Sequence, residues 1–250
     1  MKKINLFIIF YLFVVSLAAY SLDDWDRAVN IYNQNSYLKA HQVIVTSKTF
    51  NDEGVADKNV QQFFNMKYNG KEEPEMIIVK ATEDGKDTTE RVRKLAKKRV
   101  NSVDSSITQK YEGITDHPLN PDFQDRIKRT QRKDKVLKDG YLCTVWDFDF
   151  DLNDNYYGKG TAWIDSKSGR AIFIEYGIKP DFPLVRNFTM RLEFDSDGGD
   201  SWVTRKLTMK GDFIFLLLNK SFESSTEMLD WQPEEIGNYH FGISDASNLQ

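Results

Sequence analysis

The stretch from Tyr141 to Leu152, YLCTVWDFDFDL, decides the fold class because its polarity alternates with a period of two. One face of such a strand carries large rings and the other carries carboxylates, with Trp146, Phe148 and Phe150 opposite Asp147, Asp149 and Asp151. Strict alternation over this length is typical of a β-strand that buries one face. We therefore predict a strand whose aromatic face either fills a core or lines a cavity.

Segments with similar patterns lie on both sides of this stretch and are separated by turns rich in Gly, Asn and Asp. The predicted strands are Ala40–Phe50, Asn59–Tyr68, Met76–Ala81, Gly158–Asp165, Arg170–Ile178, Phe188–Asp195, Trp202–Met209, Phe213–Phe222 and Thr226–Trp231, with a further turn expected at 210–212. Short hairpin turns join antiparallel strands. The sequence therefore predicts an α+β protein that is mainly an antiparallel sheet.

Two helices are predicted beside these strands. The first starts at Asp23 or Asp24 and places Trp25, Ala28 and Val29 on one apolar face. The second follows the capping-box pattern Asp87–Glu90. Its polar face carries six basic residues, of which five are the candidate contacts: Arg91, Arg93, Lys94, Lys97 and Lys98. We interpret this face as a contact for anionic lipid headgroups or an acidic partner, with a simply solvated face as the alternative.

The first 21 residues have the features of a secretory signal peptide. Lys2 and Lys3 precede an apolar run over 4–19, and small residues follow it. We predict that residues 1–21 are cleaved and that the mature protein is periplasmic or lies in the cell envelope. An uncleaved inner-membrane anchor is the alternative.

Length and composition point to one domain after this segment. The chain has 250 residues, 40% of them hydrophobic, and a net charge of −4, which argues against a nucleic-acid binder. Cys143 is the only cysteine, so no internal disulfide can form. We predict a single half-barrel domain over 22–231, with a polar insertion at 104–136 and a polar tail at 232–250.

Catalytic and metal-binding motifs were sought in the sequence without success. The three histidines, His41, His117 and His240, have no zinc-site spacing. The run that starts at Asp149 matches the first half of an EF-hand loop, but Asp154 and Gly160 occupy positions that need Gly and Glu. We predict no catalytic residue, no metal and no cofactor. An exported hydrolase with a site assembled from distant residues stays open as an alternative.

The order of the elements resembles the periplasmic lipoprotein-carrier and outer-membrane lipoprotein-sorting family. The segment Gly158–Ile172 is similar in detail, because a strand ends in Trp163-Ile-Asp165, turns at Gly169 and returns as an apolar strand. The resemblance implies an incomplete β-barrel, a strongly curved sheet covered by helices. It also implies a concave apolar face that can hold acyl chains.

The resulting hypothesis is a non-catalytic binder of lipid or lipoprotein acyl chains on that concave face. The candidate ligand-binding residues are the bulky side chains of the predicted apolar face: Trp146, Phe148, Phe150, Ile172, Ile174, Tyr176, Met190 and Leu192. If these side chains only fill a core, the alternative is a cell-envelope interaction or sensor module. Its partner would be an envelope membrane protein docked through residues 91–136.

Overall fold

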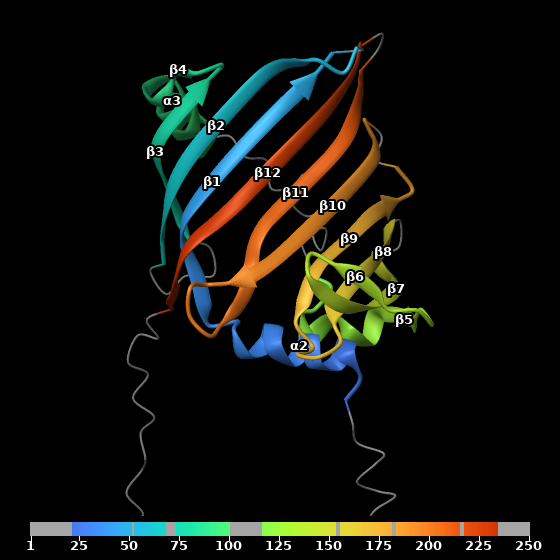
Figure 1. Ribbon diagram of the computed structural model, residues 1–250. Helices are drawn as coiled ribbons and strands as arrows, with labels where there is room; N and C mark the ends of the chain where they lie inside the picture. The colour runs from blue at the N-terminus through green and yellow to red at the C-terminus, as the bar shows by residue number, and fades with distance from the viewer. Residues whose placement is uncertain are drawn as a thin grey trace, which may run out of the picture.

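The computed structural model describes residues 22–51, 53–68, 74–100, 117–153, 156–181, 184–215 and 218–234. Its main feature is one open antiparallel sheet of twelve strands in the order β4-β3-β2-β1-β12-β11-β10-β9-β8-β7-β5, with β6 also paired to β7. The strands are long and twisted, and they do not close into a barrel (Figure 1). The predicted α+β class with an incomplete, mainly antiparallel half-barrel is confirmed.

The strand and helix bounds follow the predicted pattern along most of the chain. The strands are β1 Leu38–Phe50, β2 Ala56–Lys67, β3 Glu75–Glu83, β4 Lys86–Asp87, β5 Ile127–Gln131, β6 Val136–Lys138, β7 Tyr141–Asn153, β8 Tyr156–Asp165, β9 Ala171–Lys179, β10 Val185–Ser196, β11 Trp202–Phe215 and β12 Leu218–Pro233. The helices are α2 Asp24–Gln34, α3 Thr89–Val100 and the 3₁₀ helix η1 Pro121–Arg126.

The last strand joins the two halves of the chain. β12 lies between β11 and β1, and its antiparallel register with β1 runs from Leu38 opposite Pro233 to Phe50 opposite Ser221. Strands that are far apart in sequence therefore meet in the middle of the sheet. This pairing makes the N-terminal strands and the C-terminal meander a single layer.

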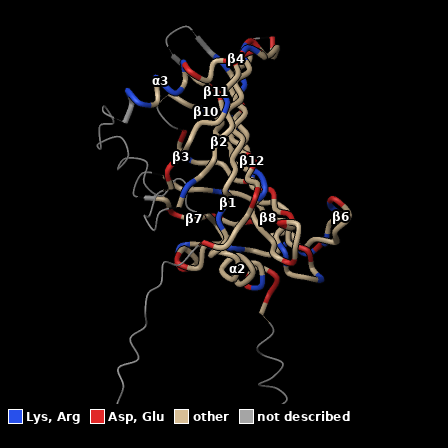
Figure 2. The backbone as a smooth tube through the Cα atoms, turned by 90° about the vertical axis from the view of Figure 1, so that its left-hand side faces the viewer, with Lys and Arg blue, Asp and Glu red and all other residues tan. Residues whose placement is uncertain are grey.

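Helix α2 covers one end of one face of the sheet, which we call the inner face. Asp23 caps it, because its carboxylate accepts a hydrogen bond of 2.8 Å from the Asp26 backbone N–H. The Trp25 ring is fully buried, with its centroid 6.2 Å from Trp146 and 5.4 Å from Phe148. Figure 2 shows α2 at one end of the sheet and α3 at the other. The hydrophobic core is therefore built beneath α2.

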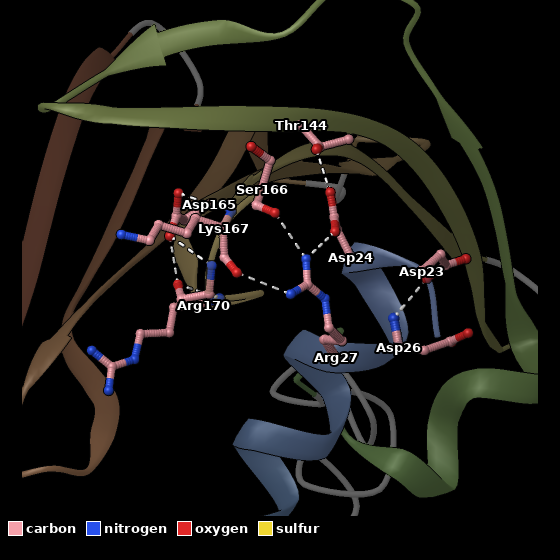
Figure 3. Close-up of polar contacts among 10 residues, drawn as sticks. Asp23, Asp24, Asp26, Arg27, Thr144, Asp165, Ser166, Lys167 and Arg170 are labelled. Atoms are coloured by element: carbon pink, nitrogen blue, oxygen red, sulfur yellow. Dashed lines mark hydrogen bonds and ion pairs between the residues drawn. The ribbon is translucent and has the colours of Figure 1, made fainter. Parts of the chain in front are cut away.

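Polar contacts fasten α2 to the turn between β8 and β9 (Figure 3). The Asp24 carboxylate accepts hydrogen bonds from Thr144 of β7 and from Arg27. The Arg27 guanidinium also donates to the carbonyl oxygens of Ser166, at 3.0 Å, and Lys167, at 3.1 Å. One arginine thus satisfies two turn carbonyls while it is held by the helix's own carboxylate.

His117 packs against the C-terminal half of α2. Its ring stacks on Tyr32 with a centroid separation of 4.2 Å and meets Phe194 edge-on at 5.6 Å. The Leu119 backbone N–H donates to Nδ1 at 3.0 Å, so the hydrogen of the neutral ring is on Nε2, which has no partner in the part of the chain that the structure describes. Burial lowers the pKa of His117 to about 3.

Two expectations about the strands were wrong. The turn expected at 210–212 is absent: β11 runs through Gly211, and the chain reverses between Phe215 and Leu218, which pair directly. Glycine at this position allows close packing and does not form a turn, because a Cβ on Gly211 would lie 2.9 Å from the Phe222 ring and 3.0 Å from Val185. The space left by the missing side chain is filled by those two neighbours.

The predicted polar insertion at 104–136 also differs, over its described part from 117 onward. This part forms η1, β5 and the first residue of β6. The alternation of β5 is hidden in sequence because Arg129 points inward, with its guanidinium 5.7 Å from the Trp25 ring and 5.6 Å from the Trp146 ring. Because this charged residue lies on the buried side of β5, the sequence of β5 lacks an apolar alternation and was predicted to be part of a loop.

We expect Arg27→Met to lower the free energy of unfolding by about 2 kcal/mol, because two turn carbonyls and the Asp24 carboxylate lose their donor. Lys167→Met is the matched control: its side chain is exposed and only its carbonyl is used, so the change should stay within about 0.5 kcal/mol. Urea unfolding of both variants measures the difference. Equal effects would show that α2 is not held by this contact.

We expect the protein to lose stability in acid through His117. The unfolded chain takes up a proton at this residue near pH 6.5, but the folded chain does so only near pH 3. The contribution of the neutral His117 ring to the free energy of unfolding is therefore complete above pH 6.5. It decreases as the pH is lowered, by about 2 kcal/mol between pH 7 and pH 5. In His117→Phe that part of the fall should vanish, as urea unfolding at the two pH values will show. An unchanged pH dependence would contradict the assignment.

Candidate ligand-binding face

Strand register defines the inner face from one side of the sheet to the other. Directly paired residues of antiparallel strands lie on the same face. One such row runs through Phe148, Gly160, Tyr176, Met190, Met209, Ser224, Ser47 and Val60. The aromatic face predicted from β7 is therefore continuous with the same face of β11, β12, β1 and β2.

The eight candidate ligand-binding residues lie at the end of this face that α2 covers. Each is at most 6% exposed, and all belong to one packed cluster with Trp25: Trp146, Phe148, Phe150, Ile172, Ile174, Tyr176, Met190 and Leu192. Their side chains fill the half-barrel at this end. A ligand could reach them only if α2 moved away, so their role as ligand contacts stays a prediction.

Two glycines of β8 allow this end to fill so tightly. A Cβ on Gly158 would lie 2.2 Å from Cζ of Phe150, and one on Gly160 would lie 2.5 Å from Cβ of Tyr176. The Phe150 ring thus lies close to the β8 backbone at Gly158, and β9 approaches it closely at Gly160. The space that could have held an acyl chain at this end is occupied by the protein's own aromatic rings.

We expect Gly160→Ala to destabilise the fold by about 3 kcal/mol, because its Cβ would also come within 2.2 Å of the Glu175 carbonyl oxygen, which cannot move aside. Gly199→Ala is the control, since its Cβ would meet only the Asp197 side chain, at 3.3 Å. Thermal and urea unfolding compare the two. A tolerated Gly160→Ala would mean that this end is less tightly filled than the structure shows.

Beyond α2 the same face is apolar but open. Its side chains on β1, β2, β11 and β12 are half-buried or exposed: Val45, Val60, Phe64, Leu207, Met209, Phe213, Phe222 and Met228. Phe213 is 46% exposed and stacks on Phe222 at a centroid distance of 4.5 Å. Small hydroxyls lie between the larger groups, with Oγ of Ser47 3.0 Å from Oγ of Ser224. This surface, which we call the open inner face, is the part that a ligand can reach directly.

Sequence reasoning missed the open inner face for two reasons. It selected the strands with the strictest alternation, and these are the most deeply buried. It also placed a turn at 210–212, which separated Phe213 from Met209 although both lie on the same face of β11. The available signal was the period-two spacing of Val43 and Val45 in β1, where Gln42, Ile44 and Thr46 take the other face.

The basic residues of α3 fall into two groups. Arg91 pairs with Glu83, and the Arg93 guanidinium donates to the carbonyl oxygens of Ile78, at 2.9 Å, and Val79, at 3.2 Å. These contacts hold α3 to β3 at the edge of the sheet, beside a polar hollow of about 830 Å³. The remaining three, Lys94, Lys97 and Lys98, are exposed. Among the α3 side chains that the structure describes, these three lysines make no such contact with the sheet, and their contact with a partner stays a prediction.

Residues that carry chemistry are dispersed. His41 lies beside Tyr68, with ring centroids 5.3 Å apart, whereas His117 is buried against α2; His240 lies outside the described residues. Burial raises the pKa of the Cys143 thiol to about 11, so it stays protonated at neutral pH. Within the ranges that the structure describes, no group of three or more His, Cys, Asp or Glu side chains could hold a metal ion.

Comparisons with known proteins show structural similarity without sequence similarity. No protein-family model and no curated protein matches the chain. A domain from Vibrio parahaemolyticus, provisionally described as an outer-membrane lipoprotein-sorting protein, is 11% identical with a TM-score of 0.37, covering 84% of this chain and 94% of its own. A DUF1329 family protein from Desulfovibrio piger is 8% identical with a TM-score of 0.37, covering 86% and 92%.

A third similar structure is that of MucB in a complex with MucA from Pseudomonas aeruginosa, with 8% identity and a TM-score of 0.22 over 84% of this chain and 98% of that chain. One of the similar structures, the Vibrio parahaemolyticus domain, thus has the same description as the family that the element order resembles. These TM-scores are too low to carry an argument about function. Among the described residues, no helix is long and apolar enough to cross a membrane.

Proposed function

We propose that this protein is an exported, non-catalytic binding protein that holds an acyl chain of a lipid or lipoprotein on its open inner face. The observation that carries the proposal is that an apolar surface continuous with the core extends beyond α2 without full cover. Its most exposed member, Phe213, is 46% exposed beside Phe222. Such a surface is costly in water unless something apolar covers it.

An acyl chain suits this surface in chemistry. The open inner face offers aliphatic and aromatic groups, with hydroxyls such as Ser47 and Ser224 already bonded to each other. A ligand can therefore cover the open inner face without providing many hydrogen-bonding groups. Each methylene group removed from water contributes about 0.8 kcal/mol, so a chain that buries ten of them gains about 8 kcal/mol before entropic costs.

The sequence of residues 1–21 supports the proposed location. Lys2 and Lys3 followed by the apolar run 4–19 fit an export signal, which would place the domain in the periplasm or cell envelope. Lipids and lipoproteins are present there. The proposed ligand and the proposed compartment are therefore compatible.

The test compares binding by variants of the two faces. We expect Phe213→Ser to weaken the binding of a fluorescent fatty-acyl probe by about tenfold, because one large ring is lost from the open inner face. Ile77→Ser is the matched control: Ile77 is 43% exposed, but its pairing with Asn65 places it on the outer face. Thermal unfolding confirms that both variants are folded.

Native mass spectrometry of the purified protein gives an independent measurement, in which we expect a co-purified lipid. No lipid and no probe uptake would overturn the proposal. That result would favour the alternative, a cell-envelope interaction or sensor module. The feature that supports this alternative is the exposed lysine group of α3, Lys94, Lys97 and Lys98. Equal loss of probe binding in Phe213→Ser and Ile77→Ser would contradict the assignment to the inner face.

A further inference from the structure

The hairpin of β6 and β7 exposes a group of aliphatic side chains at the margin of the sheet. Leu137 and Leu142 form a direct cross-strand pair and are 74% and 50% exposed, and Val136 beside them is 42% exposed. Leu137 is the most exposed of the large apolar side chains described. We call Leu137 and Leu142, which share one face of the hairpin, the leucine tip; Val136 lies on the other face, opposite Cys143. Figure 2 shows β6 projecting from the body of the sheet on the side away from α3.

The surroundings of the leucine tip are basic. The segment 126–138 holds seven Lys and Arg residues and one acidic residue, in a chain whose net charge is −4. Lys133 and Lys135 lie shortly before the tip in sequence and are exposed. Lys167 joins them from the next turn, because the Ser166 backbone N–H donates to the Leu142 carbonyl oxygen at 3.0 Å. Exposed leucines are thus bordered by exposed ammonium groups.

Most of the nearby carboxylates are already paired with arginines, so they offset the arginine charge and leave the lysines beside the tip without such partners among the described residues. Arg129 binds Asp26 at 2.7 Å and Asp23 at 3.3 Å, and Arg27 binds Asp24. Asp147 is held by the Arg132 guanidinium at 2.7 and 2.9 Å. Asp134, Asp139 and Asp165, which lies opposite Cys143, are the described acidic residues near the tip without an arginine partner. The excess of positive charge there is carried by the lysines.

The chain also enters the domain at this place. Thr144, which bonds the Asp24 carboxylate, is one residue from Cys143, the partner of Val136 in the hairpin. The start of α2 therefore lies next to the leucine tip, and Leu22 adds a further leucine that is 53% exposed.

We propose that the leucine tip and its flanking lysines form a docking surface for an anionic lipid membrane. Leu137 and Leu142 would enter the interfacial region while Lys133 and Lys135 face the phosphate groups. Apolar groups bordered by lysines bind anionic bilayers through both burial and electrostatic attraction. The surface is separate from the open inner face, so it adds a membrane contact to a proposed acyl-chain binder and does not depend on that binding.

The test is vesicle flotation of the purified full-length protein and its variants. Vesicles of phosphatidylcholine alone are compared with vesicles in which about one third of the lipid is phosphatidylglycerol. We expect the wild type to float with the anionic vesicles and to be released at high salt. The variant Leu137→Ser/Leu142→Ser and the variant Lys133→Gln/Lys135→Gln should each lose about tenfold in bound fraction at limiting lipid.

Matched controls carry the same kinds of substitution elsewhere. Leu95 and Leu184 are 53% and 55% exposed, so Leu95→Ser/Leu184→Ser removes comparable apolar surface, and Lys94→Gln/Lys97→Gln removes two lysines from α3. Both controls should float like the wild type. All variants should keep the thermal unfolding midpoint and the acyl-probe binding of the wild type, which separates failure of this proposal from failure of the proposed function.

Three results would overturn the docking surface. The wild type would fail to float with anionic vesicles, or the tip variants would float as well as the wild type, or the α3 lysine control would lose binding in their place. Capture of a protein by a photo-crosslinker at position 137 in intact cells, without vesicle binding, would also overturn it in favour of a protein partner.

Discussion

The packing of Trp25 on Trp146 and Phe148 is the interaction on which the rest of the structure depends. A single sheet cannot bury a face by itself, and among the described elements α2 and the short helix η1 lie over this face, with Phe123 of η1 packed on Phe150. The core therefore forms where these two helices cover the sheet. Beyond them most large side chains of the same face are only half-buried or exposed, so the helices, above all the 11-residue α2, divide the inner face into a filled part and an open part.

The outer face is covered in a different way. Phe173 stacks on Trp163 at 4.1 Å, and the Arg191 guanidinium and the Lys138 ammonium lie over its ring at 4.4 and 5.2 Å. Long basic side chains can shield aromatic rings with their aliphatic stems while their charged ends remain in water. These contacts cover the large outward-facing ring of β9 without a second helical layer on this side of the sheet.

The sequence was sufficient for the fold class, for α2 and for most strands, because these follow from local alternation and capping. It was insufficient where a side chain is explained only by a distant partner. Arg129 points inward because Trp25, Trp146, Asp23 and Asp26 meet there, and Gly211 lies within a strand because Phe222 and Val185 fill its space. The partners of Arg129 cannot be identified before the pairing of β5 with β7 and the place of α2 are known, and those of Gly211 require the strand order β12-β11-β10.

The same limit explains the position of the candidate site. A strand with strict alternation has one face that is wholly apolar. Such faces are buried in the core, and here they are the ones that lie beneath α2. A surface that must be stable both with and without a ligand should instead mix apolar and small polar side chains. The open inner face has this mixture, with Phe213 and Phe222 at one end, Phe64 and Met228 toward the other, and Ser47 and Ser224 between them. Imperfect alternation was therefore the better indicator of an accessible surface, and perfect alternation was the better indicator of a core.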